Sequence, residues 1–158
     1  MIIVICGVTG SGKTTVGSLL AAQLQLPFVD ADDHHPASNI QKMKEGIPLD
    51  DSDRLPWLQQ LNQILKAHEK SGLVLACSAL KEKYRQQLQE GLSERIRWFF
   101  LLVDKAVVKE RLQKRKDHFM SPGLLQSQLH LLEVTHEAIS LNGNMSAQEI
   151  VADIIKRL

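Results

Sequence analysis

A glycine-rich segment near the start of the chain has the residue types that bind a nucleoside triphosphate. Residues 7–14 match the P-loop pattern G-x-x-x-x-G-K-[ST] at every required position. Glycines let the backbone wrap closely around phosphate oxygens, and the N-terminus of the following helix adds partial positive charge. Lys13 can reach the β- and γ-phosphates, and the Thr14 hydroxyl can ligate Mg²⁺. The alternative is a glycine-rich turn with an exposed lysine. The predicted ATP-binding residues are Gly7, Val8, Thr9, Gly10, Ser11, Gly12, Lys13, Thr14 and Thr15.

The P-loop alone does not identify the group that receives the phosphate. A GTPase would carry an N-K-x-D motif, which the sequence lacks, and a motor or translocating ATPase needs a larger machine than 158 residues. We therefore predict a small P-loop kinase that uses a nucleoside triphosphate and Mg²⁺.

Two carboxylates follow the second predicted strand, residues 27–30. Asp30 and Asp32 lie at its carboxyl end, the edge where open parallel sheets bind ligands. We expect both carboxylates on an extended segment and predict separate tasks for them. Asp32 can accept the proton of a substrate hydroxyl, which in phosphoryl transfer mainly orients that hydroxyl, and Asp30 can help to hold Mg²⁺ through water. A solvated turn is the alternative.

The adjacent His34 and His35 raise the question of a metal site. Neighbouring side chains diverge, and no further His/Cys cluster lies nearby at zinc-like spacing. We therefore predict a hydrogen bond from His35, either to the substrate or within the protein.

The composition indicates one globular domain, residues 1–158. The chain is 44% hydrophobic and 23% charged, with a net charge of +1, so nothing in its overall charge favours nucleic acid or a membrane as partner. Cys6 and Cys77 each end an apolar run and are predicted to be buried thiols without a disulfide. No apolar run has membrane-spanning length, and the opening one is too short for a signal peptide. We expect a cytoplasmic protein.

Strand-like and helix-like segments alternate along the chain, which predicts an α/β fold with a parallel sheet covered on both faces. The predicted strands are residues 2–6, 27–30, 74–77, 96–103 and 137–142. The predicted helices are residues 13–25, 36–46, 54–71, 80–90 and 105–116, one beginning at 121, and a last one after a capping box of Ser146 and Glu149.

A basic run in the fifth predicted helix is a candidate for contact with the transferring phosphoryl group. Arg111 and Arg115 are four residues apart and share a helix face. We predict a helical lid over residues 111–125 that closes on ATP and brings these arginines to the phosphates. A solvated basic helix is the alternative. A nucleic-acid patch is disfavoured because no aromatic residues interleave with the charges.

Longer motifs are specific enough to indicate a family. Residues 30–43 resemble the signature D-x-D-x-x-H-P-x-x-N-x-x-K-M of gluconate kinases, and residues 77–85 resemble C-S-A-L-K-x-x-Y-R of the same family. The other matching segments are residues 46–49, 51–58, 111–112, 115, 118–120, 124–128 and 132–133. The match loosens after Glu133, where Val134 stands in place of a common proline.

This resemblance implies ATP-dependent phosphorylation of D-gluconate on its 6-hydroxyl, giving 6-phospho-D-gluconate and ADP. It also implies a three-layer P-loop kinase fold, related to shikimate and adenylate kinases, with five parallel strands in the order 2-3-1-4-5 and a helical lid. A homodimer is implied as well.

Gluconate carries hydroxyls and a carboxylate, so its pocket needs cations and hydrogen-bonding groups. The predicted substrate-binding residues are Asp32, His35, Arg54, Lys81, Arg85 and His118. The predicted catalytic residues are Lys13, Asp32, Arg111 and Arg115, and the predicted metal ligands are Thr14 and Asp30. Alternatives are that Arg54 pairs with Asp51 or Asp53, that Lys81 is solvated, and that Trp57 packs beside the pocket.

Two other functions are considered. A shikimate-like or nucleotide kinase is disfavoured because residues 77–80 read Cys-Ser-Ala-Leu where shikimate kinases carry a glycine cluster. The second is a non-catalytic regulator that binds ATP or RNA through the basic helix.

Overall fold

A five-stranded parallel sheet forms the centre of the protein. The computed structural model describes residues 1–114, 122–134 and 138–158. The strands are β1 (Ile2–Cys6), β2 (Phe28–Asp30), β3 (Leu73–Ala76), β4 (Arg97–Leu102) and β5 (Ile139–Asn142). Their order is β2-β3-β1-β4-β5, and each neighbouring pair is parallel. The predicted fold class and strand order are confirmed.

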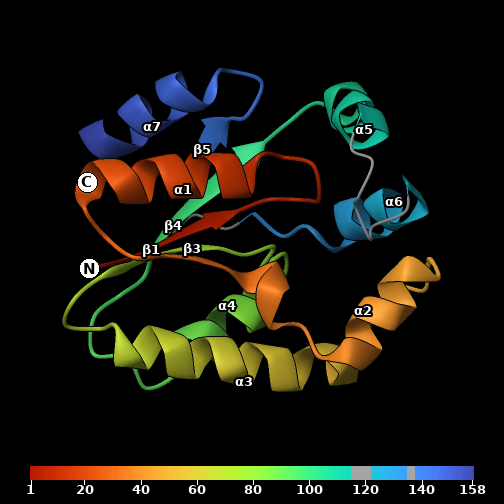
Figure 1. Ribbon diagram of the computed structural model, residues 1–158, viewed down its shortest axis with the longest axis horizontal. Helices are drawn as coiled ribbons and strands as arrows, with labels where there is room; N and C mark the ends of the chain where they lie inside the picture. Colours follow the sequence, from red (N-terminus) through yellow and green to blue (C-terminus); the bar gives the residue numbers. More distant parts are fainter. Residues whose placement is uncertain (115–121, 135–137) are drawn as a thin grey trace.

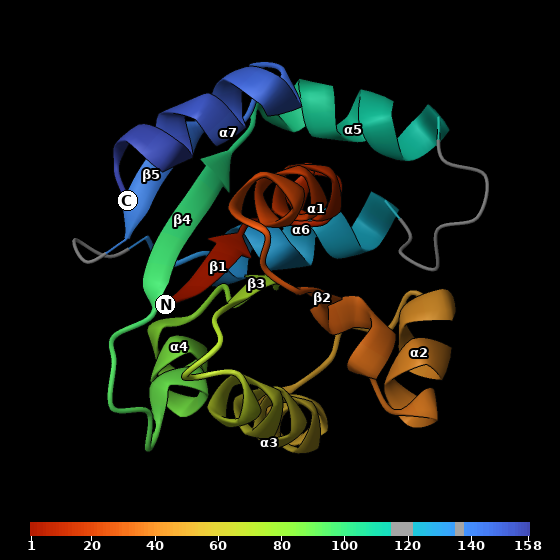
Figure 2. The same cartoon turned by 60° about the vertical axis from the view of Figure 1, so that its left-hand side comes forward.

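Helices cover both faces of the sheet and gather at one end of it. The helices are α1 (Lys13–Leu24), α2 (Ala37–Lys44), α3 (Asp51–Ala67), α4 (Glu82–Gln89), α5 (Lys105–Lys114), α6 (Pro122–Leu131) and α7 (Ala147–Lys156). Figures 1 and 2 show α1 and α7 on one face of the sheet and α3 and α4 on the other, with α2, α5 and α6 toward the carboxyl ends of the strands. Within the described ranges, no helix combines the length and apolar character that a membrane crossing demands.

Strand β1 is buried on both faces, which explains its continuous apolar run. Ile2, Val4 and Cys6 pack toward α3 and α4, whereas Ile3 and Ile5 pack toward α1 and α7. The strand that leads into the phosphate loop is therefore fixed from both sides.

Both cysteines are buried free thiols, as predicted. Burial is the main cause that raises the pKa of Cys77 to about 12, and it raises that of Cys6 as well. Neither side chain forms a reactive thiolate near neutral pH.

Two local features differ from the sequence predictions. Helix α3 begins at Asp51 rather than at residue 54, because Asp50 and Asp53 form a capping box: the N–H of Asp53 donates to Asp50 Oδ1 (2.8 Å) and the N–H of Asp50 donates to Asp53 Oδ2 (3.0 Å). Asp32 lies in a 3₁₀ turn (Ala31–His34) and not in an extended segment. The predicted capping box of Ser146 and Glu149 at α7 is confirmed.

Candidate functional site

The phosphate loop joins β1 to α1, and its backbone has positive φ angles at three glycines. Gly7, Gly10 and Gly12 have φ values of 151°, 75° and 99°, in the region that residues with a Cβ rarely adopt. A Cβ on Gly7 would lie 2.6 Å from Ser11 Oγ, so the loop closes on itself only without a side chain there. Lys13 is 9% exposed, and its Nζ donates to the carbonyl of Val8 (3.1 Å). The ammonium group is thus held along the inner side of the loop.

One buried polar atom of the loop fits a phosphate ligand. Ser11 Oγ is buried and has no hydrogen-bond partner among the described residues. Leaving a buried hydroxyl unpaired costs about 1–3 kcal/mol, which a phosphate oxygen can offset. Together with the Lys13 ammonium and the start of α1, this hydroxyl makes the predicted loop chemically suited to a triphosphate.

Thr14 and Asp30 lie together beside the loop. The Thr14 hydroxyl donates to Asp30 Oδ2 (2.6 Å), and Asp30 Oδ1 accepts the N–H of Asp32 (3.1 Å). A hydroxyl and a carboxylate are the hard oxygen donors that Mg²⁺ prefers, with water and phosphate oxygens completing its shell. In the described part of the chain, no group of three or more His, Cys, Asp or Glu side chains could hold a metal by itself.

A narrow cavity lies next to this loop and contains Asp32. Its volume is about 30 Å³, roughly the space that one water molecule takes in the liquid. Its polar and aromatic lining includes Asp32, His35, Arg54, Trp57, Ser78 and Gln128. Met43, Leu49 and Leu124 pack together at its apolar side and join the α2–α3 region to α6. Three of the predicted substrate residues therefore share one cavity: Asp32, His35 and Arg54.

His35 is held as a neutral ring within this cavity. It stacks on Trp57 with a centroid distance of 4.2 Å, and its Nε2 lies 4.0 Å from Asp32 Oδ1. Asn39 contacts its Nδ1 at 3.3 Å. Burial, and then the nearby charge of Arg54, lowers the pKa of His35 to about 4. The imidazole is therefore uncharged at neutral pH and acts by hydrogen bonding.

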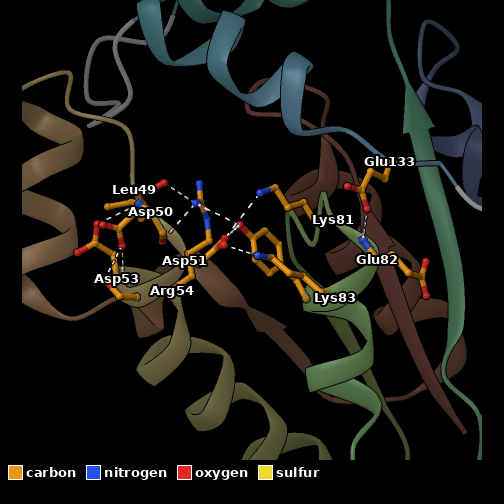
Figure 3. Close-up of polar contacts among 11 residues, drawn as sticks. Leu49, Asp50, Asp51, Asp53, Arg54, Lys81, Glu82, Lys83 and Glu133 are labelled. Carbon is orange, nitrogen blue, oxygen red and sulfur yellow. Dashed lines mark hydrogen bonds and ion pairs between the residues drawn. The ribbon is translucent and has the colours of Figure 1, made fainter.

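Arg54 lines the cavity, whereas Lys81 lies outside its lining. One nitrogen of Arg54 donates to the carbonyl of Leu49 and contacts the Tyr84 hydroxyl at 3.4 Å. The acidic partners considered for Arg54 from the sequence bind lysines instead, since Asp53 pairs with Lys42 and Asp51 with Lys81 and Lys83. Figure 3 shows this arrangement between the start of α3 and the start of α4.

Arg85 has a different position from the one expected, because it lies outside the cavity and is almost completely buried. Its Nη1 donates to the carbonyls of Ala79 (2.8 Å) and Leu80 (3.2 Å), and its Nη2 donates to the carbonyl of Glu133 (2.8 Å). The guanidinium also lies 5.1 Å from the centre of the Phe100 ring. These contacts tie the β3–α4 connection to the segment after α6, so direct contact with a substrate stays a prediction.

Arg111 reaches the phosphate loop from α5. Its Nη1 donates to the carbonyl of Ser11 (3.2 Å), and its Nη2 donates to the carbonyl of Gly143 (3.2 Å). The expected lid over residues 111–125 is described only in part, and Arg115 and His118 lie outside the described residues. Of the two arginines predicted to act on the phosphoryl group, Arg111 is thus placed beside the loop.

Gln128 belongs to the site although the sequence analysis gave it no role. Its Oε1 accepts the backbone N–H of Thr9 (2.6 Å), and its side chain also lines the cavity. This contact joins residues 119 positions apart. The only available signal was the family motif over residues 124–128, because no local spacing relates Gln128 to the loop.

Replacing Gln128 should separate its structural from its electrostatic effect. Gln128→Ala removes a buried acceptor and should lower the free energy of unfolding by about 1–3 kcal/mol. Gln128→Glu keeps an acceptor but places a carboxylate beside the phosphate loop, and should weaken ATP binding. Urea denaturation and calorimetric titration with ATP measure the two effects. Gln126→Ala, an exposed change on the same helix, is the control, and equal results for Gln126→Ala and Gln128→Ala would contradict the assignment.

The buried His35 should make stability depend on pH. The unfolded chain takes up a proton near pH 6.5 but the folded protein only near pH 4, so stability is retained above 6.5 and falls between 6.5 and 4. The loss reaches about 3 kcal/mol, since a pKa difference of one is worth about 1.4 kcal/mol. Urea denaturation from pH 7.5 to 4.5 should show a shallower pH dependence for His35→Phe than for the wild type. The neighbouring change His34→Phe is the control, and equal slopes for the wild type and His35→Phe would refute the prediction.

Several known proteins resemble this chain in sequence. A family model described as Shikimate kinase matches residues 9–158. A probable gluconokinase of Dictyostelium discoideum is 42% identical over 172 residues, covering 100% of this chain and 86% of that protein. The thermosensitive gluconokinase of Escherichia coli (strain K12) is 46% identical over 133 residues, covering 82% of this chain and 70% of that protein.

Solved structures agree with these relatives. The crystal structure of a gluconokinase from Sinorhizobium meliloti 1021 matches with a TM-score of 0.87 and 39% sequence identity, covering 98% of this chain and 89% of the other. Sequence and structure therefore agree over most of both chains. The chain belongs to the gluconokinase family of ATP-dependent P-loop kinases, within the wider group that the shikimate kinase model describes.

Proposed function

We propose that the protein transfers the γ-phosphoryl group of ATP to the 6-hydroxyl of D-gluconate, giving 6-phospho-D-gluconate and ADP. The observation that carries this proposal is one cavity, beside the phosphate loop, that holds both a carboxylate, Asp32, and a fixed cation, Arg54. A carboxylate can orient a hydroxyl, and a guanidinium can bind a carboxylate in bidentate fashion. A sugar acid offers both groups, and the relatives named gluconokinase support this choice.

Two positively charged side chains beside the phosphate loop are proposed to stabilise the transferring phosphoryl group. Lys13 lies along the inner side of the loop, and Arg111 contacts the loop backbone from α5. Both charges favour the transition state, in which negative charge spreads over the oxygens of the transferring group. Arg115 is proposed to add a second arginine.

Mg²⁺ is proposed to bind at Thr14 and, through water, at Asp30. When bound there, the ion neutralises charge on the β- and γ-phosphate oxygens. The hydrogen bond between the two side chains keeps their oxygen atoms together at 2.6 Å.

Asp32 is proposed to accept the hydrogen bond of the 6-hydroxyl and to aim its oxygen at the γ-phosphorus. The neutral His35 ring, 4.0 Å from that carboxylate, offers a further hydrogen bond to substrate hydroxyls. Arg54 is proposed to bind the acceptor carboxylate, with Lys81 beside it and His118 as a further contact. Arg85 is better placed to hold the β3–α4 connection than to touch the acceptor.

The cavity must widen before such an acceptor can enter. A six-carbon acid is far larger than the volume of about 30 Å³. Its apolar side is closed by Met43, Leu49 and Leu124, which come from the α2–α3 region and from α6. We propose that these two regions move apart for binding and close again over the substrate, as lids of small kinases do. A homodimer is proposed from the family resemblance, and a cytoplasmic location from the two free cysteines.

A coupled assay of ADP release tests the acceptor directly. With ATP and Mg²⁺ present, gluconate should support turnover at least about 100-fold above shikimate, nucleoside monophosphates or other sugar acids, because a site built for one pattern of polar groups rejects others strongly. Phosphorus NMR of the product identifies the esterified hydroxyl. Turnover on shikimate or on a nucleoside monophosphate, but not on gluconate, would refute the proposal.

Asp32→Asn should lower kcat by at least about 100-fold, the usual contribution of a group that accepts a proton in the transition state. ATP binding should persist, because Asp32 is proposed to contact the acceptor and not the nucleotide. Stopped-flow turnover and calorimetric titration with ATP measure the two quantities. Asp33→Asn, an exposed change at the next position, is the matched control. Unchanged turnover in Asp32→Asn would remove this carboxylate from the mechanism.

A further inference from the structure

We call the cavity that contains Asp32 the acceptor cavity. Among the described residues that line it, Arg54 is the one lysine or arginine. Its position is therefore decisive for any acid that binds there. A guanidinium at the end of a long side chain has many rotamers, and holding it in one of them costs conformational entropy. The protein must supply contacts that fix it.

The Tyr84 hydroxyl is one of these contacts and has a defined direction. It donates its hydrogen to Asp51 Oδ1 (2.6 Å), which leaves a lone pair for the Arg54 nitrogen at 3.4 Å. The Arg54 guanidinium carbon also lies 5.4 Å from the centre of the Tyr84 ring, within the range of a cation–π contact. Tyr84 therefore supports Arg54 both with its ring and with its hydroxyl.

Asp51 forms ion pairs with two lysines that lie near the Tyr84 ring. Its carboxylate lies 3.7 Å from Lys81 Nζ, and it also binds Lys83. Both ammonium groups lie within 6 Å of the Tyr84 ring centre, at 5.7 and 5.8 Å. Figure 3 shows Asp51 between Arg54 and the two lysines. Asp51 thus pairs with two lysines, while the tyrosine that it accepts a hydrogen bond from also contacts Arg54.

The protonation of this pair is fixed over the physiological range. Hydrogen bonds from Lys83 and Tyr84 lower the pKa of Asp51 to about 2. Burial, together with the hydrogen bond to Asp51, raises the pKa of Tyr84 to about 12. The donor–acceptor direction from Tyr84 to Asp51 therefore does not reverse near neutral pH.

We propose that Asp51 and Tyr84 are positioning residues that hold Arg54, and Lys81 beside it, for the carboxylate of the acceptor. Neither residue lines the cavity, so both act through the cations that they orient. The proposal rests on the proposed function, in which the acceptor is a sugar acid. It adds a residue pair, on α3 and α4, that determines how well the acid group is bound.

A purely structural link between α3 and α4 is the competing explanation, and kinetics separate the two. Losing a structural link lowers stability without acting on one substrate alone. Losing the positioning of Arg54 raises KM for gluconate, whereas kcat and KM for ATP change little, because the phosphate loop and Asp32 are untouched.

Tyr84→Phe and Asp51→Asn are the test variants, because each keeps the shape of the side chain. Each should raise KM for gluconate about tenfold, the effect of losing one hydrogen bond that involves a charged group. Values of kcat and of KM for ATP should stay within about twofold of the wild type. Lys83→Met is the control, since it removes an ion pair of Asp51 with a half-exposed lysine that has no contact with Arg54 in the described structure.

A double-mutant cycle with Arg54→Met completes the experiment. If Tyr84 acts through Arg54, adding Tyr84→Phe to Arg54→Met should raise KM for gluconate no further. Independent, multiplicative effects, or an unchanged KM in both single variants, would overturn the positioning role. Wild-type protein that does not phosphorylate gluconate would instead refute the proposed function and, with it, this inference.

Discussion

The turn after β1 is the constraint on which the rest of the site depends. The backbone must curve between Gly7 and Gly12 so that the Ser11 hydroxyl faces the space that a Cβ of Gly7 would fill. Helix α5 closes the loop from outside, since a Cβ on Gly10 would lie 3.1 Å from atoms of Val108 and Leu112. The loop is therefore held by its neighbours in one shape, and the other residues of the candidate site are arranged around it.

The parallel sheet explains how two neighbouring carboxylates come to have different surroundings. Asp30 ends β2 and faces Thr14 at the start of α1, because the carboxyl ends of parallel strands meet the helix that follows the loop. The 3₁₀ turn then redirects the chain, and its first bond is the N–H of Asp32 donated to Asp30. Asp32 consequently lines the cavity and does not face Thr14 as Asp30 does. The extended backbone expected for this segment was wrong, and it would have put both side chains on one face; the 3₁₀ turn gives them different surroundings.

Features encoded over short stretches could be predicted from the sequence. The phosphate loop and the capping box at Ser146 depend on residues close together in the chain, whereas the strand order followed from the family resemblance. The early start of α3 was missed because three aspartates in four residues look equally like a solvated turn. Arg85 shows a second limit of prediction from sequence. The side chain is buried and donates to carbonyl groups, and the sequence does not distinguish such an arginine from one that binds substrate. Only the tertiary structure separates the two cases.

Contacts between residues far apart in the sequence could not be predicted in this way, and one of them joins the phosphate loop to a residue of the cavity lining. Gln128 touches the acceptor cavity and the N–H of Thr9 in the phosphate loop. The cavity is too small for a sugar acid until α6 or the α2–α3 region shifts. A shift of α6 strains the bond between Gln128 and Thr9, whereas a shift of the α2–α3 region leaves it intact. If α6 moves, acceptor binding and nucleotide binding must influence each other, and by thermodynamic linkage they do so equally in both directions.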